Sequence, residues 1–217
     1  MIQETQGNPI TSPYGDDWDM LWLGYCGMKI LEEQRGEKRR IFVIPNDPTL
    51  RPPHHKEQEF WGPTIAEFPG MEPHRMIFDA ADGVCSLAFG ITYEGARKAL
   101  AAFSMMGLDE PMDLSYRYLC NGQFPLRFRC LAPYPTLISS WRQAGMLWRD
   151  SDIVETAPEE WHDAHSFGIV YSTMLNAIAL ANGSKTARAQ WDDVAPLEIE
   201  PETFEIPRGV LWLPDQL

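Results

Sequence analysis

A carboxylate-rich turn that runs directly into a short apolar strand constrains this chain more than any other feature. Pro13 and Gly15 are typical of a turn, because proline fixes φ and glycine permits unusual backbone angles. Residues Met20–Leu23 form an apolar run bounded by turn residues, which predicts a buried strand covered on both faces. Loops beside such strands often carry ligand-binding groups in α/β enzymes, so Asp17 and Asp19 either bind a ligand or only solvate the turn.

Strands and helices alternate in the predicted secondary structure, which favours an α/β sheet over all-α or all-β units. Runs of β-branched and aromatic residues, ended by proline or glycine, predict the strands, and amphipathic spacing predicts the helices. The expected strands after the first are Ile41–Pro45, Arg75–Ala80, Val84–Ile91 and Leu126–Tyr134, and two of the expected helices are Met112–Cys120 and Ser166–Ala181. The excursion Asn46–Gly70 is rich in proline and should hold little regular structure.

A further helix should begin after Thr92, whose hydroxyl can act as an N-cap, and end at Gly107. Its spacing predicts an apolar face toward the sheet, made of Ala96, Ala99, Leu100, Phe103 and Met106. The helix Ser166–Ala181 is expected to carry a broad apolar stripe and to end at Asn182-Gly183.

Composition excludes some classes of function. A formal net charge of −13 argues against nucleic-acid binding, which needs clustered lysine and arginine. No apolar run approaches the roughly 20 residues that span a membrane, and the polar start Met1–Gly7 lacks the pattern of a signal peptide. The four cysteines show no zinc spacing; they are either free thiols or two disulfides in one of three connectivities.

Other side chains are weaker candidates for binding. Trp61 and Trp141 lie in predicted loops and could stack on a sugar ring, whereas Trp22 lies in a strand and should be core. Arg97 near a helix start could meet a phosphate or remain a solvated surface charge. His54-His55 should be exposed. His162 and His165 would share one face if helical, which gives two imidazoles but no fixed third metal ligand.

The order of these motifs resembles fungal glycosyltransferase family 25 proteins, a family that includes lipooligosaccharide and collagen galactosyltransferases. The resemblance is collinear from Ser12 to Asn182, and it rests on the order and spacing of several short pieces. The matching segments are Ser12–Gly27, Ile44–Asp47 with Pro52–His55, Ile91–Leu100, Pro111–Leu114, Cys130–Leu131 with Tyr134–Pro135, and Asp150–Ile153.

The resemblance implies a GT-A-like mixed sheet flanked by helices in one domain, 1–217, with residues 183–217 as a surface-wrapping tail. It implies inverting transfer of a hexose from a nucleotide sugar to a glycan or protein acceptor. Such enzymes usually hold a divalent metal such as Mn²⁺ on an Asp-x-Asp-like motif. The resemblance also implies the disulfides Cys26–Cys85 and Cys120–Cys130, and the Golgi lumen or secretory pathway as the compartment.

The resemblance also suggests site residues. Asp113, in a Pro-x-Asp context before a helix, matches the position of a catalytic base near the acceptor, although an aspartate there also suits the helix dipole. Asp17, Asp19, Trp61, Arg97 and Trp141 are the expected substrate-binding residues. No metal ligands are found in the chain: the family's acidic metal motif would precede Ser12, and Ser139–Arg142 stands where related sequences have histidines.

Only eleven residues precede Ser12, so we expect the chain to lack the nucleotide-binding half of the fold. Two functions follow: a glycosyltransferase-like protein, truncated or inactive, or a non-catalytic module of that fold that binds carbohydrate or protein. The strand Met20–Leu23 should then expose an apolar edge. We expect this edge either to form a homo-oligomer or to be covered by the tail Pro196–Leu213.

Overall fold

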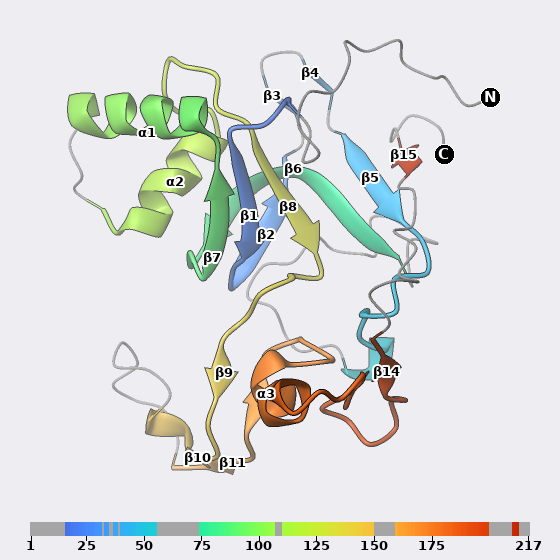
Figure 1. The fold of residues 1–217 in the computed structure, drawn as a ribbon. Coiled ribbons are helices and arrows are strands. Elements are labelled where there is room, and N and C mark those ends of the chain that lie inside the picture. Colours follow the sequence, from blue (N-terminus) through green and yellow to red (C-terminus); the bar gives the residue numbers. More distant parts are fainter. Residues whose placement is uncertain are drawn as a thin grey trace.

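A mixed sheet forms the larger part of this computed structural model, which describes residues 16–31, 33–34, 37–38, 40–55, 74–106, 110–149, 159–199 and 210–212 (Figure 1). Six of its seven strands form one row in the order β15-β5-β6-β8-β1-β7, and β2 pairs with β6 beside this row. Only β1 and β8 run parallel; the other pairs are antiparallel. The strands are β1 (Met20–Gly24), β2 (Gly27–Ile30), β5 (Ile41–Ile44), β6 (Arg75–Val84), β7 (Ala88–Ile91), β8 (Cys130–Tyr134) and β15 (Val210–Trp212).

Strand β1 is paired on both sides, so the expectation of an exposed edge at Met20–Leu23 is wrong. Met20 lies opposite Cys130 of β8 and opposite Ile91 of β7. Two strands that come later in the sequence therefore take the positions beside β1. The tail does cover an edge, but it is that of β5, where Val210 pairs with Val43.

Strands β2 and β5 lie end to end along the same edge of β6. The amide of Asp79 donates to the carbonyl of Arg40, and the carbonyl of Asp79 accepts from the amide of Leu31. Both groups of one residue point to the same edge of an antiparallel strand. The small hairpin of β3 (Glu33–Gln34) and β4 (Glu37–Lys38) thus interrupts what is otherwise one long strand.

The apolar core lies between this sheet and its helices and includes Trp22, Phe78 and Phe128, all fully buried. The indole nitrogen of Trp22 donates to the carbonyl of Cys85 at 2.9 Å, which satisfies its only polar atom. A Cβ atom at Gly83 would lie 2.7 Å from the Trp22 ring, so the close packing of β6 on β1 requires glycine there.

Helix α1 (Tyr93–Met106) begins as predicted, because the Thr92 hydroxyl accepts a hydrogen bond from the Gly95 amide at 2.9 Å. Its predicted apolar face is wrong in part: Ala99, Ala102 and Phe103 face the core, whereas Ala96 is exposed and Leu100 is 69% exposed. The reason is Gly95. A Cβ there would lie 2.4 Å from the Asp19 carbonyl oxygen, so the helix turns its glycine toward β1 and its leucine away.

Helix α2 (Met112–Cys120) has the predicted bounds, with Pro111 before it and Asn121 as its C-cap. It packs against β6, where Asp82 accepts from Arg117 and Asn121. Burial alone raises the pKa of Asp82, but hydrogen bonds from Asn121 and Lys29 and the charge of Arg117 outweigh it, so that pKa lies below 3.8.

The two disulfides have the pairing that the resemblance implied, Cys26–Cys85 and Cys120–Cys130. The first joins the start of β2 to the turn between β6 and β7, and the second joins the end of α2 to the start of β8. Both are compatible with the secretory pathway, since disulfides persist in oxidising compartments. Within the described ranges, the structure contains no helix long and apolar enough to cross a membrane.

Three predicted strands, β6, β7 and β8, have bounds that differ by several residues from those predicted. Strand β6 continues to Val84, so the turn lies at 85–87 and β7 is shorter than expected. The left-handed backbone of Asp82 (φ 52°) and Cys85 (φ 61°) bends the chain there. Strand β8 begins at Cys130 because Leu126 belongs to the loop that packs Phe128 into the core.

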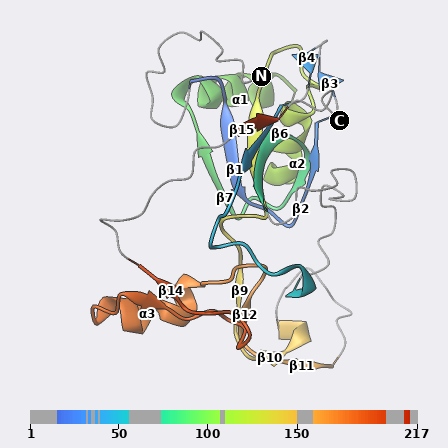
Figure 2. The same ribbon diagram turned by 90° about the vertical axis from the view of Figure 1, so that its right-hand side faces the viewer.

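A smaller part made of short strands and one helix lies below the sheet (Figures 1 and 2). Helix α3 spans Thr173–Ala181, so the predicted start at Ser166 is wrong. Ser166 belongs to β12, and the predicted stripe is largely exposed: Met174 is 61% and Ile178 80% exposed. The remaining elements are η1 (Pro53–His55), β9 (Trp141–Arg142), β10 (Gly145–Met146), η3 (Leu147–Arg149), β11 (Trp161–His162), β12 (His165–Ser166), β13 (Thr186–Ala187) and β14 (Leu197–Glu198).

Polar contacts anchor α3. The buried Asn176 side chain donates to the carbonyls of Ser172 and Arg188 and accepts from the Arg188 amide.

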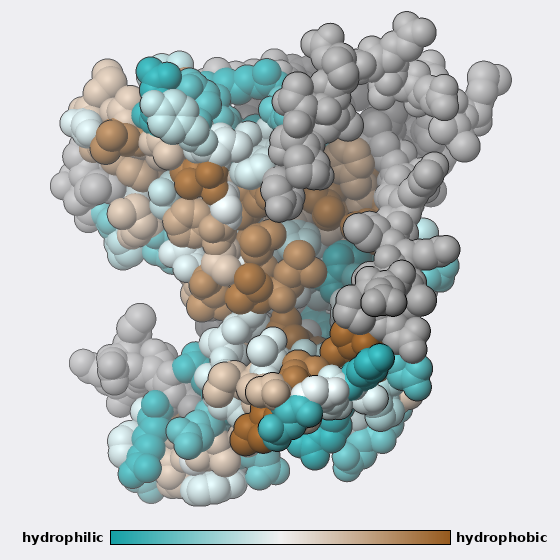
Figure 3. All heavy atoms as spheres, viewed as in Figure 1, coloured by the Kyte–Doolittle hydropathy of each residue, from teal (hydrophilic) through white to brown (hydrophobic). Residues whose placement is uncertain are grey.

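Three apolar side chains, Leu87, Leu137 and Ile138, are exposed around the end of β1. Their backbone amides donate to the carbonyls of Gly24 and Leu23. Apolar side chains gather midway down the face in Figure 3.

Removing either disulfide should destabilise the chain, and the bridge that closes the longer loop should contribute more. Because Cys26–Cys85 closes 59 residues and Cys120–Cys130 closes 10, the chain-entropy model gives about 4 and about 3 kcal/mol of unfolding free energy. Denaturant unfolding of the Cys26→Ser/Cys85→Ser and Cys120→Ser/Cys130→Ser variants measures both losses. Equal stability of the first variant and the wild type would contradict the prediction.

Stability should fall in acid. Burial raises the pKa of Asp47, but hydrogen bonds from Thr49 and Arg75 outweigh this and lower it below 3.8, as at Asp82. A lowered folded-state pKa contributes stability above the unfolded value near 3.8 that is lost as pH falls through the folded value. Urea unfolding between pH 5 and 2 should therefore show a decline below about pH 4. The decline should be shallower in Asp47→Asn, and an unchanged slope in that variant would contradict the assignment.

Candidate functional site

A pocket of about 270 Å³ opens beside the acidic turn that leads into β1. The turn, the start of α1 and the loop before β8 form its walls. The pocket therefore lies at the amino ends of β1 and β8 and not at the carboxyl ends, where parallel α/β sheets usually bind ligands. Its lining residues are Asp16, Asp17, Trp18, Asp19, Thr92, Glu94, Lys98, Arg127 and Arg129.

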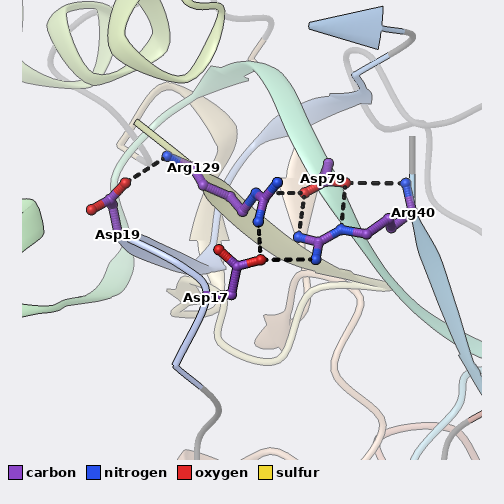
Figure 4. A network of polar contacts seen from close by, with 5 residues as sticks. All are labelled: Asp17, Asp19, Arg40, Asp79 and Arg129. Atoms are coloured by element: carbon purple, nitrogen blue, oxygen red, sulfur yellow. Dashed lines mark hydrogen bonds and ion pairs between the residues drawn. The ribbon is translucent and has the colours of Figure 1, made fainter. Parts of the chain in front are cut away.

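Beneath this pocket, carboxylates alternate with guanidinium groups (Figure 4). Asp79 of β6 accepts from the backbone amide of Arg40 at 3.0 Å and from its Nη2 at 3.2 Å, and the Nε of Arg129 lies 3.7 Å from Asp79. Asp17 accepts from the same two arginines. The Asp79 side chain is 9% exposed and that of Asp17 is 67% exposed, so one carboxylate is buried under the network and the other closes it toward solvent.

These contacts change the acidity of an arginine. Partial burial lowers the pKa of Arg40, but hydrogen bonds and charge from Asp79 and Asp17 outweigh it and raise that pKa above its ordinary value. The positive charge of Arg40 therefore balances the two carboxylates.

The carboxylate of Asp19 accepts hydrogen bonds both from a backbone amide and from helix α1. One carboxylate oxygen accepts from Lys98 of α1 at 2.7 Å, and the other accepts from the backbone amide of Arg129 at 2.9 Å. Its carbonyl accepts from the Thr92 amide, which starts α1. Asp19 lines the pocket, as expected of a substrate-binding residue, but it is buried. Both of its carboxylate oxygens are already bonded to groups of the chain itself.

The three carboxylates do not fit a Mn²⁺ ion. Asp17, Asp19 and Asp79 are each bonded to an arginine or lysine, so cationic side chains hold the positions where a metal would bind. Mn²⁺ needs several free oxygen ligands. Asp17-x-Asp19 therefore has the spacing of a metal motif but not its surroundings.

Two other predicted site residues, Asp113 and Arg97, do not line this pocket. Asp113 is at the first turn of α2, where its carboxylate accepts from the Cys85 amide at 2.9 Å and supports the left-handed turn after β6. Arg97 is exposed and pairs with Glu94 at 3.2 Å. Trp61 lies outside the described residues.

Trp141 belongs to β9 and lines a separate pocket of about 340 Å³. Two arginines, Arg142 and Arg149, also line this pocket. The structure therefore brings together Asp17 and Asp19, but not Asp113, Arg97 or Trp141.

Sequence reasoning missed three cations and one carboxylate: Arg40, Asp79, Arg127 and Arg129. Lys98 could be found from the sequence, because it lies within the first two turns after the N-cap Thr92 and directly follows Arg97 in the Gly-Ala-Arg-Lys motif. The others are far apart in the sequence, and only the sheet topology brings them together.

A second polar cluster lies on the smaller part. The Nε2 atoms of His54 and His55 lie 2.6 and 2.7 Å from the two carboxylate oxygens of Asp193. Hydrogen bonds to these imidazoles lower the pKa of Asp193 to about 2. His54 is exposed as expected, but the side chain of His55 is only 22% exposed.

His162 and His165 are not on a helix; they lie on the short strands β11 and β12 with ring centroids 5.2 Å apart. The Nδ1 atom of each lies about 3 Å from the Asp163 carbonyl oxygen. In the described parts of the chain, the only group of three or more ligands that could hold a metal is His54, His55 and Asp193.

Comparison with protein-family models, with curated proteins and with solved structures finds no match.

Replacing Asp79 should cost far more stability than replacing Asp17. Asp79→Asn leaves two partly buried guanidinium groups without their buried counter-charge, so we expect a loss of about 3 kcal/mol in unfolding free energy. Asp17→Asn, the matched control at the solvent end, should cost less than about 1 kcal/mol. Urea unfolding of both variants measures the difference, and similar losses would show that the network does not depend on Asp79.

Proposed function

We propose that this chain is a glycosyltransferase-like carbohydrate-binding protein, and that the pocket beside β1 binds a sugar. The observation that carries the proposal is the composition of that pocket. The half-buried Trp18 lies among hydroxyl, carboxylate and cationic side chains in a space of about 270 Å³. Sugars are bound in this way, with an aromatic face against C–H groups and polar side chains on the hydroxyls.

The charged side chains of the pocket favour sugar binding over sugar transfer. Transfer from a nucleotide sugar leaves a diphosphate, which needs a counter-charge to depart. Three of the carboxylates that line the pocket, Asp17, Asp19 and Glu94, are bonded to the chain's own cations and so favour neither a metal nor proton abstraction. Asp113, the expected base, is bonded to the Cys85 amide and does not line the pocket.

One observation favours the second candidate function, hexosyl transfer. Lys98, Arg127 and Arg129 all line the pocket, and cationic side chains can stabilise a diphosphate in place of a metal. In that case the nucleotide sugar would bind against these three cations, with Asp17 or Asp19 exchanging partners as it enters. Binding of the nucleotide diphosphate distinguishes this candidate from the first.

Sugar binding is measured by titrating the protein with neutral oligosaccharides and following its melting temperature and binding heat. We expect at least one glycan to raise the melting temperature. Trp18→Ala should weaken that binding at least about tenfold, because stacking is lost. Trp148→Ala is the matched control, since Trp148 is exposed on η3 outside the pocket. Equal losses in both variants, or no glycan bound, would contradict the proposal.

The transferase candidate is measured with nucleotide diphosphate sugars, with and without Mn²⁺. It predicts stabilisation by the nucleotide that is lost in Lys98→Met, and release of nucleotide diphosphate when an acceptor is present. Asp113→Asn should then abolish turnover while the melting temperature changes little. Turnover that survives in Asp113→Asn would remove Asp113 as the base, and no response to any nucleotide sugar would leave sugar binding alone.

A further inference from the structure

Two histidines and an aspartate from distant parts of the sequence meet at the surface of the smaller part. His54 and His55 end η1, and Asp193 lies 138 residues after His55. The Nε2 atom of each imidazole faces a different oxygen of the same carboxylate, at 2.6 and 2.7 Å. All three ligand atoms lie within 4.8 Å of one another.

Contacts outside this cluster hold the histidines in place. The ring of His55 stacks on Trp191, with centroids 4.4 Å apart and planes 8° from parallel. The segment before η1 is tied to the sheet by Asp47, which accepts from Arg75, and by Arg75, which also donates to Thr49. Adjacent histidines in a free loop would chelate poorly, but here the backbone already turns both rings toward one point.

We propose that His54, His55 and Asp193 form a surface site for a divalent transition-metal ion, with Zn²⁺ as the best chemical match. The ligand set is two imidazole nitrogens and one carboxylate oxygen, which suits Zn²⁺ and its neighbours in the transition series. A tetrahedral Zn²⁺ with bonds near 2.0–2.1 Å separates its ligand atoms by about 3.3 Å. The present separations of 2.6 and 2.7 Å between imidazole nitrogens and carboxylate oxygens would open by about 0.6 to 0.7 Å, which surface side chains can accommodate.

Binding exchanges hydrogen bonds for metal bonds. Each Nε2 that now faces the carboxylate would present its lone pair to the metal, and the ring proton would reside on Nδ1. Water would complete the coordination, because the three side chains provide three positions and the site is open to solvent. The ion would fasten the segment before η1 to the segment after α3.

This site is distinct from the sugar pocket and does not depend on it. None of its three residues lines that pocket. It also differs from the acidic, oxygen-rich motif that Mn²⁺ transferases use, so the two inferences stand or fall separately.

The experiment is a calorimetric titration of chelator-treated protein with ZnCl₂. We expect one Zn²⁺ per chain, and at least about tenfold weaker binding in each of His54→Ala, His55→Ala and Asp193→Asn. The matched control is His162→Ala/His165→Ala, which removes the chain's other close histidine pair and should bind like the wild type. The replaced side chains are at the surface, and circular dichroism with thermal unfolding in EDTA verifies that each variant is folded.

Two further readouts locate the ion. Co²⁺ in place of Zn²⁺ should give visible absorption bands typical of nitrogen and oxygen ligands, absent in His54→Ala/His55→Ala. Cu²⁺ should quench the fluorescence of Trp191, which contacts the proposed ligand His55, and Trp191→Phe should remove most of that quenching. Zinc bound equally by His54→Ala/His55→Ala, zinc lost in the His162→Ala/His165→Ala control, or no zinc bound by the wild type would each overturn the proposal.

Discussion

The buried carboxylate of Asp79 is the contact on which the arrangement of this sheet depends. Asp79 lies in β6, while its partners Arg40 and Arg129 immediately precede β5 and β8. Through Asp17, which binds the same arginines, the network also reaches the turn before β1. One buried charge thus links the beginnings of three strands to the middle of a fourth. Removing a partner from such a network leaves uncompensated charge in a poorly solvated place.

The same network determines the chemistry of the pocket above it. Because the arginines and Lys98 are bonded to Asp17, Asp19 and Asp79, the pocket floor carries paired charges. A ligand rich in hydroxyl groups can bind such a surface by hydrogen bonds without displacing an ion pair. A strongly anionic or cationic ligand would have to compete with the existing pairs. This pairing of charges is the reason for proposing a sugar, and not a metal ion, as the ligand of the pocket.

Local features of the fold could be predicted from the sequence, and long-range ones could not. The N-cap at Thr92, the bounds of α2 and the strand at Met20–Leu23 follow from propensity and capping within a few residues. The partners of β1 depend on chain reversals more than 60 residues later, which no local pattern encodes. The face of α1 was mispredicted because Gly95 had to meet the Asp19 backbone, and apolar spacing alone favoured Leu100. The site could likewise be predicted only in part: the acidic turn is apparent in the sequence, but the cationic residues that pair with it are not.

The pairing of β15 with β5 has a consequence for biosynthesis. Strand β5 ends at Ile44, but its outer neighbour begins only at Val210. At translation rates of 5–20 residues per second, the edge of β5 waits about 10 to 30 seconds for its partner to be made. During that interval a nascent chain presents a bare hydrogen-bonding edge, which is the feature that chaperones shield and that aggregation exploits. Efficient production of this protein should therefore depend on whether a chaperone at the ribosome exit covers the edge of β5 during those seconds.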